Sequence, residues 1–285
     1  MKMKKLLNKI SGFDKEKSIS IKKSTKADSY LKMEDLIKDE SKEKVIFINE
    51  NLNVKIVDII IGNVNTKSET KFIVGKNSSL HYLCISDLEE NSLFNKNDES
   101  FLDIGSTMHY KSLNLGGVND IKYIANCGEK TNSNISNVFL GQKSDDFKVI
   151  VENNILEREV KGKILIKSVL KDGAKGNIEG RIKITKNGAL ADTYLKEDVL
   201  LLDNQSSVKA IPLLAIDTND VKAGHGVSVT KLDLEELFYM MSRGLDEKEA
   251  KKMIVEGFLI DLFEEEIDDL TIGRYILEGV RKRFS

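Results

Sequence analysis

The stretch GKILIKSVLKDGAKGNIEGRIKITKNG, residues Gly162–Gly188, alternates apolar and polar side chains in short runs that each end at a turn. The run GKILIKSVL ends at Asp172-Gly173, and the run GRIKITKNG contains its own Asn187-Gly188 pair. Alternation with period two is typical of β-strands, and Asp-Gly and Asn-Gly pairs are typical of tight turns. This stretch therefore predicts successive short strands with no helix between them.

The same pattern extends in both directions from this stretch. Towards the N-terminus it includes KVIFINENLNVKIVDIIIG and FKVIVENNI, and towards the C-terminus it includes DVLLLDN. Turn signals recur about every 8–12 residues, as in all-β folds. Such spacing is compatible with a sandwich, with a barrel, or with a solenoid in which each strand stacks on the equivalent strand of the next coil. Periodicity alone does not choose among these three folds.

After Lys231 the period becomes helical. Asp233 is a candidate N-cap, and Gly244 follows the first helix at a position that favours a left-handed residue. Asp246 repeats the start signal for a second helix, and a third helix is expected over about 270–284. Arg243 and acidic residues are better placed to face a partner. We expect the apolar residues of the first two helices to form an internal core of this unit: Leu237, Phe238, Met241, Met253, Ile254 and Phe258.

The chain is therefore expected to have three parts. Residues 1–44 form a basic N-terminal arm that is partly helical, with a helix around Ser29–Lys38. Residues 45–230 form the β core, and residues 231–285 form a small C-terminal helical domain. Overall the fold is predicted to be mainly β, followed by a few helices.

Composition excludes several classes of protein. The chain has 285 residues, of which 40% are hydrophobic and 32% charged, so neither a disordered chain nor a membrane protein is expected. Two cysteines cannot build a disulfide scaffold, and a net charge of −2 gives no general electrostatic reason to bind nucleic acid. The start of the sequence does not resemble a signal peptide, so we expect a cytoplasmic protein.

Few residues stand out as chemically active, since the sequence has no phosphate-binding loop, dinucleotide fingerprint, nucleophile elbow or HExxH motif. We expect Cys84 to be a core residue and Cys127, beside a glycine turn, to reach solvent. His81 and His109 occupy ordinary strand or loop contexts. His225 differs because it stands between two glycines, which would allow a ligand or another backbone to approach its imidazole.

The stretch Ile211–Leu259, with its IPLLAI run, NDVKAGHG, the LFYMMSRG helix end and a further helix reaching GF, resembles the C-terminal core of the SufB/SufD family. These proteins are scaffolds of the SUF iron–sulfur cluster assembly machinery. The upstream segment GRIKITKNGALADTYLKEDVLLLDN also resembles the preceding coils of the family, so the clear resemblance covers about residues 180–259. The His225-Gly226 pair resembles the SufD form, because SufB-type chains have an acid after this histidine.

The resemblance implies a right-handed parallel β-helix, or β-solenoid, followed by a helical domain. It also implies a non-catalytic scaffold that pairs through its β-helix with a second SufB/SufD-like subunit or with itself. The C-terminal helices would dock a SufC-like ABC-type ATPase, and ATP hydrolysis would belong to that partner. Neither nucleic acid nor a membrane is an expected partner.

The resemblance also implies the site residues. His225 matches the family histidine and would lie near the subunit interface, where iron or a transient iron–sulfur cluster would bind. Glu197 stands where SufB-type chains have a cluster-serving cysteine. A carboxylate can ligate iron, although it matches an iron–sulfur cluster less well than a thiolate does. His225 and Glu197 are therefore the candidate cofactor and metal ligands.

Two other functions remain open. The chain could be the homodimeric scaffold of a minimal system that works only with its ATPase. Alternatively, it could be a structural or regulatory binding module that pairs with partners but holds no cluster, as suggested by Glu197 at the cysteine position. An enzyme acting on a polymer along a β-helix groove is disfavoured, because no pair of catalytic carboxylates can be located in the sequence.

Overall fold

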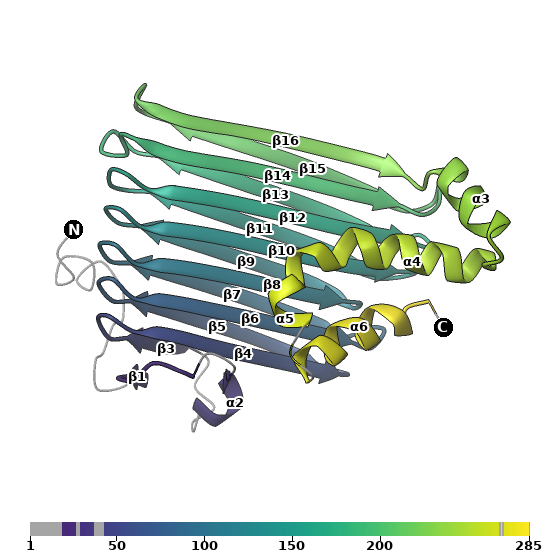
Figure 1. Cartoon of the computed structure of the whole chain (residues 1–285), viewed down its shortest axis with the longest axis horizontal. Helices are drawn as coiled ribbons and strands as arrows, with labels where there is room; N and C mark the ends of the chain where they lie inside the picture. Colours follow the sequence, from purple (N-terminus) through teal and green to yellow (C-terminus); the bar gives the residue numbers. More distant parts are fainter. Residues whose placement is uncertain (1–18, 27–28, 37–42, 268, 270, 285) are drawn as a thin grey trace.

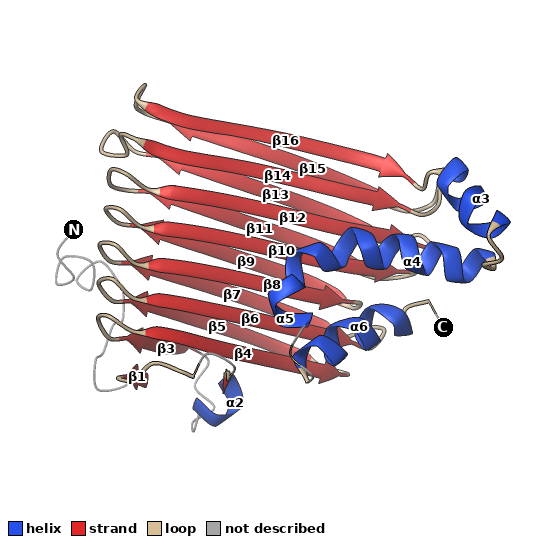
Figure 2. Ribbon diagram, in the orientation of Figure 1, coloured by secondary structure: helices blue, strands red, loops and turns tan. Residues whose placement is uncertain are grey.

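The computed structural model describes residues 19–26, 29–36, 43–267, 269 and 271–284 of the chain. Two eight-stranded parallel sheets lie face to face, and consecutive strands alternate between them (Figures 1 and 2). The chain thus winds as a parallel β-solenoid of about seven turns, followed by helices. This confirms the fold that the resemblance implies and excludes the sandwich and the barrel that periodicity left open.

The two sheets are named here by their strand numbers. The odd sheet contains β1 (Ile19–Ile21), β3 (Glu43–Ile48), β5 (Asn65–Val74), β7 (Leu93–Leu102), β9 (Val118–Cys127), β11 (Asp146–Ile155), β13 (Lys175–Ile184) and β15 (Ser207–Ile216). The even sheet contains β2 (Leu31–Lys32), β4 (Asn53–Gly62), β6 (Ser79–Leu88), β8 (Thr107–Leu115), β10 (Asn132–Gln142), β12 (Lys161–Lys171), β14 (Ala191–Leu201) and β16 (Val221–Lys231).

The period-two pattern sorts each strand into an inner and an outer row. In the even sheet, Ile135, Ile164 and Leu195 are aligned across three neighbouring strands, and all three are buried between the sheets. Because the same register recurs in every coil, apolar side chains stack on their equivalents above and below, which buries apolar surface along the whole solenoid.

One polar cluster interrupts this inner stack. Lys96 on β7 is almost completely buried, and its Nζ lies 3.2 Å from Asp58 and 3.3 Å from Asp98. The Tyr82 hydroxyl donates to Asp58 and the Tyr110 hydroxyl donates to Asp98. A buried charge is tolerated when it is paired and hydrogen-bonded, and these contacts join strands of both sheets inside the solenoid.

The N-terminal arm expected over residues 1–44 contributes to the solenoid where the structure describes it. β1 pairs with β3, and β2 pairs with β4. The helix expected at Ser29–Lys38 is represented by β2 and a short helix, α2 (Met33–Leu36), while residues 37 and 38 lie outside the described part. Ile21 and Met33 are buried against the first coils, so this end of the solenoid is covered.

The remaining helices follow β16. They are α3 (Leu234–Ser242), α4 (Glu247–Ile260), a short 3₁₀ segment (Asp261–Phe263), α5 (Glu264–Ile267) and α6 (Ile272–Lys282). Asp233 caps α3, Asp246 caps α4, and Gly244 between them has a φ of 98°, as predicted from the sequence. Helices α4 to α6 return along the stack in front of the even sheet, whereas α3 lies near its β16 end (Figure 1).

A second apolar cluster joins the helices to the outer face of the even sheet. It includes side chains of the sheet such as Leu113 and Val138, and helical side chains such as Val255, Phe263 and Ile276. The helical part therefore stabilises itself mainly against the solenoid and not around a separate core. Among the described residues, no helix is long and apolar enough to cross a membrane.

The expectation of an internal helical core is wrong for three of its members. Phe238 is 72% exposed, and Met241 and Met253 are also exposed, whereas Leu237 is buried. Ile254 and Phe258 do pack, but against the cluster shared with the sheet. An apolar stripe on a helix predicts that this face packs against another surface. It does not show whether that surface belongs to the same chain or to another protein.

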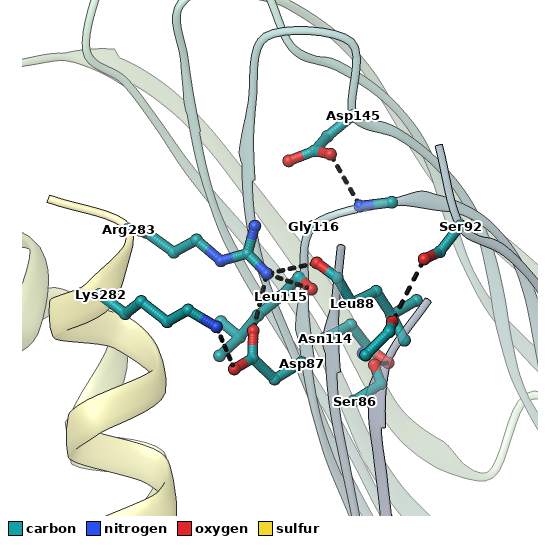
Figure 3. Close-up of polar contacts among 12 residues, drawn as sticks. Ser86, Asp87, Leu88, Ser92, Asn114, Leu115, Gly116, Asp145, Lys282 and Arg283 are labelled. Carbon is teal, nitrogen blue, oxygen red and sulfur yellow. Dashed lines mark hydrogen bonds and ion pairs between the residues drawn. The ribbon is translucent and has the colours of Figure 1, made fainter. Parts of the chain in front are cut away.

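An arginine fixes the end of α6 to the solenoid (Figure 3). The Nη2 atom of Arg283 donates to Asp87 Oδ1 at 2.7 Å and to the backbone oxygens of Leu88 at 2.6 Å and Leu115 at 3.0 Å. Gly116 has a φ of 70°, and a side chain there would meet the guanidinium group. We call these contacts of Arg283 with Asp87, Leu88 and Leu115 the Arg283 clasp.

Candidate functional site

Among the residues that the structure describes, nothing covers the last coil of the solenoid, formed by β15 and β16, on the side away from the stack. Each of these strands is the end strand of its sheet. Val227 and Val229 continue the inner row above Glu197 and Val199, yet they are 43% and 49% exposed. The last coil therefore presents core-type side chains and two strand edges, which is the surface that a further strand or coil would cover.

His225 lies in this open inner row. It is aligned with Leu195, which is buried one coil below, and its own side chain is exposed. The flanking glycines belong to the outer row, where they make room for Tyr194. A Cβ atom at Gly226 would lie 2.9 Å from the Tyr194 hydroxyl, and one at Gly224 would lie 3.3 Å from its ring. The two glycines thus accommodate this tyrosine, and the imidazole points to the opposite face of the sheet.

Glu197 lies inside the solenoid, one coil below the open surface. Its side chain is buried, Oε1 accepts a hydrogen bond from the Gly180 backbone at 2.8 Å, and Oε2 has no partner in the described part of the chain. Burial raises the pKa of this carboxyl to about 7, partly offset by the Gly180 hydrogen bond. At neutral pH, Glu197 can therefore hold or release a proton.

His225 and Glu197 share one face of the even sheet. They lie on adjacent strands two positions apart, because Glu197 is aligned with Val227. Strand spacings of about 4.8 Å laterally and 3.3 Å per residue put their Cα atoms roughly 8 Å apart. His225 is accessible and Glu197 is closed in beneath Val227, so the two could ligate one ion only after the last coil opens.

The two cysteines are remote from solvent. Cys84 is buried in the core as expected, but Cys127 is buried too, so the expectation that it reaches solvent is wrong. Burial raises the pKa of each thiol to about 12. The glycine turn beside Cys127 follows the end of β9, and the cysteine itself occupies the inner row of that strand. Neither thiol is available as a thiolate ligand at neutral pH.

Within the part of the chain that the structure describes, no three His, Cys, Asp or Glu side chains converge as a metal site. His225 and Glu197 therefore offer at most two ligands at the open coil within the described residues.

Sequence reasoning missed two contributors to this region. Gly180 admits the Glu197 carboxylate, since a Cβ atom there would lie 2.7 Å from Oε1. Helix α3 exposes Leu234, Phe238, Tyr239 and Met241, so it is apolar on its solvent side. The sequence already indicated that some apolar side chains of α3 would be exposed, because its apolar residues occupy more than one stripe of this short helix.

Comparison with known proteins gives a consistent result. A family model described as "SUF system FeS cluster assembly, SufBD core domain" matches residues 34–258. The iron–sulfur cluster assembly protein SufD of Bacillus subtilis is 26% identical over 259 residues, covering 84% of this chain and 54% of that protein. A SufBD family iron–sulfur cluster assembly protein of Staphylococcus haemolyticus is 27% identical over 251 residues, covering 84% of this chain and 53% of that protein.

The chain spans about half the length of these two relatives. The family model covers most of the solenoid and reaches into α4, so it includes the open coil, Glu197 and His225. The chain belongs to the SufBD family of iron–sulfur cluster assembly proteins.

Proposed function

We propose that this protein is a non-catalytic scaffold subunit of a SUF-type iron–sulfur cluster assembly complex. The observation that carries the proposal is the open last coil, where Val227 and Val229 occupy core positions but remain exposed. In a β-solenoid each coil buries its inner row against the next, and no described part of the chain covers this coil on one side. A second SufBD-like subunit, or a second copy of the chain, would supply it.

The proposed cargo site lies at that junction. His225 faces the open side and can offer its imidazole, while the partner subunit would contribute the remaining ligands, including thiolates. Glu197 would join only after β16 moves away from β14. Incomplete ligation by each subunit favours release of a cluster to an acceptor protein.

The ATPase partner is proposed to dock on α3. Of its side chains, only Leu237 is buried, whereas Phe238 and Met241 are exposed, and Tyr239 is exposed beside Arg243. Exposed aromatic residues next to an arginine are typical of protein–protein interfaces. ATP hydrolysis would take place in that partner, which is consistent with the missing phosphate-binding loop.

Light scattering of the purified chain, alone and co-expressed with a SufB-like subunit, tests the pairing. We expect wild type to assemble in at least one of these settings and Val227→Lys/Val229→Lys to remain monomeric in both. Leu93→Lys is the matched control, because Leu93 is similarly exposed on the outer face of β7. Pairing would be refuted by a monomeric wild type in both settings, or by a double variant that assembles normally.

Co-purification with a SufC-like ABC-type ATPase tests the docking surface. Phe238→Glu should abolish co-purification, whereas Met253→Glu, an equally non-disruptive change at an exposed position of α4, should retain it. Retention by Phe238→Glu would show that α3 is not the docking surface. Failure of wild type to bind any such ATPase would count against the scaffold function as a whole.

The burial of Glu197 favours one second candidate, a binding module that pairs with partners but holds no cluster. Anaerobic reconstitution of the complete complex separates the two functions. A scaffold should lose bound iron and sulfide when His225 is changed to Ala. Equal occupancy in wild type and His225→Ala would remove His225 from the site, and no cluster in wild type would support the binding module.

A further inference from the structure

Two histidines outside the open coil lie side by side on the even sheet. His81 on β6 and His109 on β8 are aligned in register, and both belong to the outer row. Their rings are stacked, with centroids 4.2 Å apart and planes 16° apart. β8 and β16 are separated by four steps in the strand order, so this pair is independent of the proposed cargo site.

Burial disfavours protonation of both rings. Each is half-buried, and burial lowers the pKa of both, that of His81 to about 4. Within the described residues, the two rings stack on each other, and neither ring nitrogen has a hydrogen bond. Neutral imidazoles with unused nitrogen lone pairs are the form in which histidine ligates metals.

The charged groups around the pair include one suitable acid. Glu265 on α5 acts electrostatically on both imidazoles, while Lys55 on β4 acts on His81 and Lys111 acts on both. Lys111 is engaged with Glu266 through a 2.8 Å ion pair. Glu265 has no ion pair with any described residue, so its carboxylate remains available to a cation held by the two rings.

We propose that His81 and His109 bind one divalent transition-metal ion, such as Zn²⁺ or Cu²⁺, with Glu265 as a third ligand. The three groups do not converge in the structure as it stands. Two nitrogen ligands of a tetrahedral zinc ion lie roughly 3.4 Å apart, because each Zn–N bond is about 2.0–2.1 Å long. Binding one ion therefore requires the two rings to rotate about their Cβ–Cγ bonds out of the stacked arrangement. The donor set of imidazoles and a carboxylate suits these ions better than Mg²⁺ or Ca²⁺.

The test uses the full chain without an affinity tag, titrated with Zn²⁺ in competition with a chromophoric chelator and with Cu²⁺ under electron paramagnetic resonance. We expect one Zn²⁺ per chain and a Cu²⁺ spectrum with hyperfine structure from two imidazole nitrogens. His81→Ala and His109→Asn should each weaken Zn²⁺ binding about 100-fold or more. Even the loss of a residue that only hydrogen-bonds to a metal ligand lowers metal affinity by about 10–100-fold. Asn is a safe replacement because Asn134 continues the same row on β10.

Asn134→Ala is the matched control, because Asn134 is the next residue of the same outer row on β10 and has no imidazole. It should bind Zn²⁺ as wild type does. Normal Zn²⁺ binding by His81→Ala and His109→Asn, or loss of binding in Asn134→Ala, would overturn the proposal. If Glu265→Gln bound Zn²⁺ with unchanged affinity, Glu265 would not be a ligand of the ion.

Discussion

Gly180 donates its backbone N–H to Glu197 Oε1 across 2.8 Å, from a position where any side chain would meet that same carboxylate. The two residues come from opposite sheets, so the contact crosses the interior of the solenoid. A missing side chain on β13 therefore creates the space in which the acidic residue of β14 is buried. The inner row would otherwise be filled by apolar groups such as Leu195, whose methyl groups also approach Gly180.

Gly180→Ala should lower the free energy of unfolding by about 1–3 kcal/mol, the usual cost of forcing an extra group into a packed interior. The added methyl group would overlap Leu195 and the Glu197 carboxylate. Chemical denaturation measures the change. Gly257→Ala on α4 is the control, since nothing lies within 4 Å of the new methyl group, and it should raise stability by about 0.5–1 kcal/mol. Equal midpoints for Gly180→Ala and wild type would contradict this packing.

Glu197 should make stability depend on pH. Its pKa is raised from 4.5 to about 7 in the folded chain, so the folded state binds the proton more tightly than the unfolded state does. The stabilisation from the protonated form is complete below pH 4.5 and is lost as the pH rises through 7. The loss should be about 3 kcal/mol, because the folded and unfolded pKa differ by about 2.5 and one pKa unit corresponds to about 1.4 kcal/mol.

Denaturation of wild type and Glu197→Gln at several pH values isolates this contribution. Glutamine keeps an oxygen acceptor for the Gly180 N–H and cannot ionise. The stability difference in favour of the glutamine variant should therefore grow between pH 5 and 8. A difference that stays constant over this range would mean that Glu197 is ionised throughout.

Leu190 is a site where stability can be increased. It has a φ of 61° and is exposed, and its N–H donates to the Asp220 backbone oxygen. The equivalent turns carry Asn51, Asn77 and Gly105, which tolerate positive φ better than a leucine does. Leu190→Asn and Leu190→Gly should each raise the free energy of unfolding by about 1 kcal/mol.

Leu190→Ala is the matched control for that comparison, because alanine removes the same apolar side chain but keeps the backbone strain. It should leave the unfolding midpoint near that of wild type. If alanine stabilised the protein as much as glycine did, the exposed side chain and not the backbone would be the cause.

The cysteines should be inert in the folded protein. Both thiols are buried, with their pKa raised to about 12, so a thiol reagent such as dithionitrobenzoate should react with neither at neutral pH. Two equivalents should react after unfolding in guanidinium. Rapid reaction of one thiol under native conditions would indicate that the coil around it opens.

Local patterns predicted the elements well. Alternation around Ile164 and Ile182 predicted strands, and Asp233 and Asp246 marked the helix starts that the structure confirms. The choice of a solenoid could not come from alternation, because strand pairing is set by residues about one coil apart, such as Asn132 and Lys161. The family resemblance supplied that information.

Side-chain environments were harder to predict for the same reason. Cys127 follows a strand pattern on one side and a turn on the other, and only its inner-row register shows that it is buried. Phe238 fits a helical stripe, but the face it joins has no partner within the described chain. The metal-binding roles of His225 and Glu197 stay predictions.

The Arg283 clasp has a consequence for how the molecule unfolds. In a simple solenoid each coil contacts only its neighbours, so coils can fray one at a time from either end. Here Arg283 holds backbone oxygens of β6 and β8, and α4 packs on β12, so several coils are tied into one cooperative block. β16 contributes no described side chain to the apolar cluster under the helices. Amide hydrogen exchange should therefore be fastest, among the long strands, in the coil that is left outside the block, which is the coil that a partner would have to join.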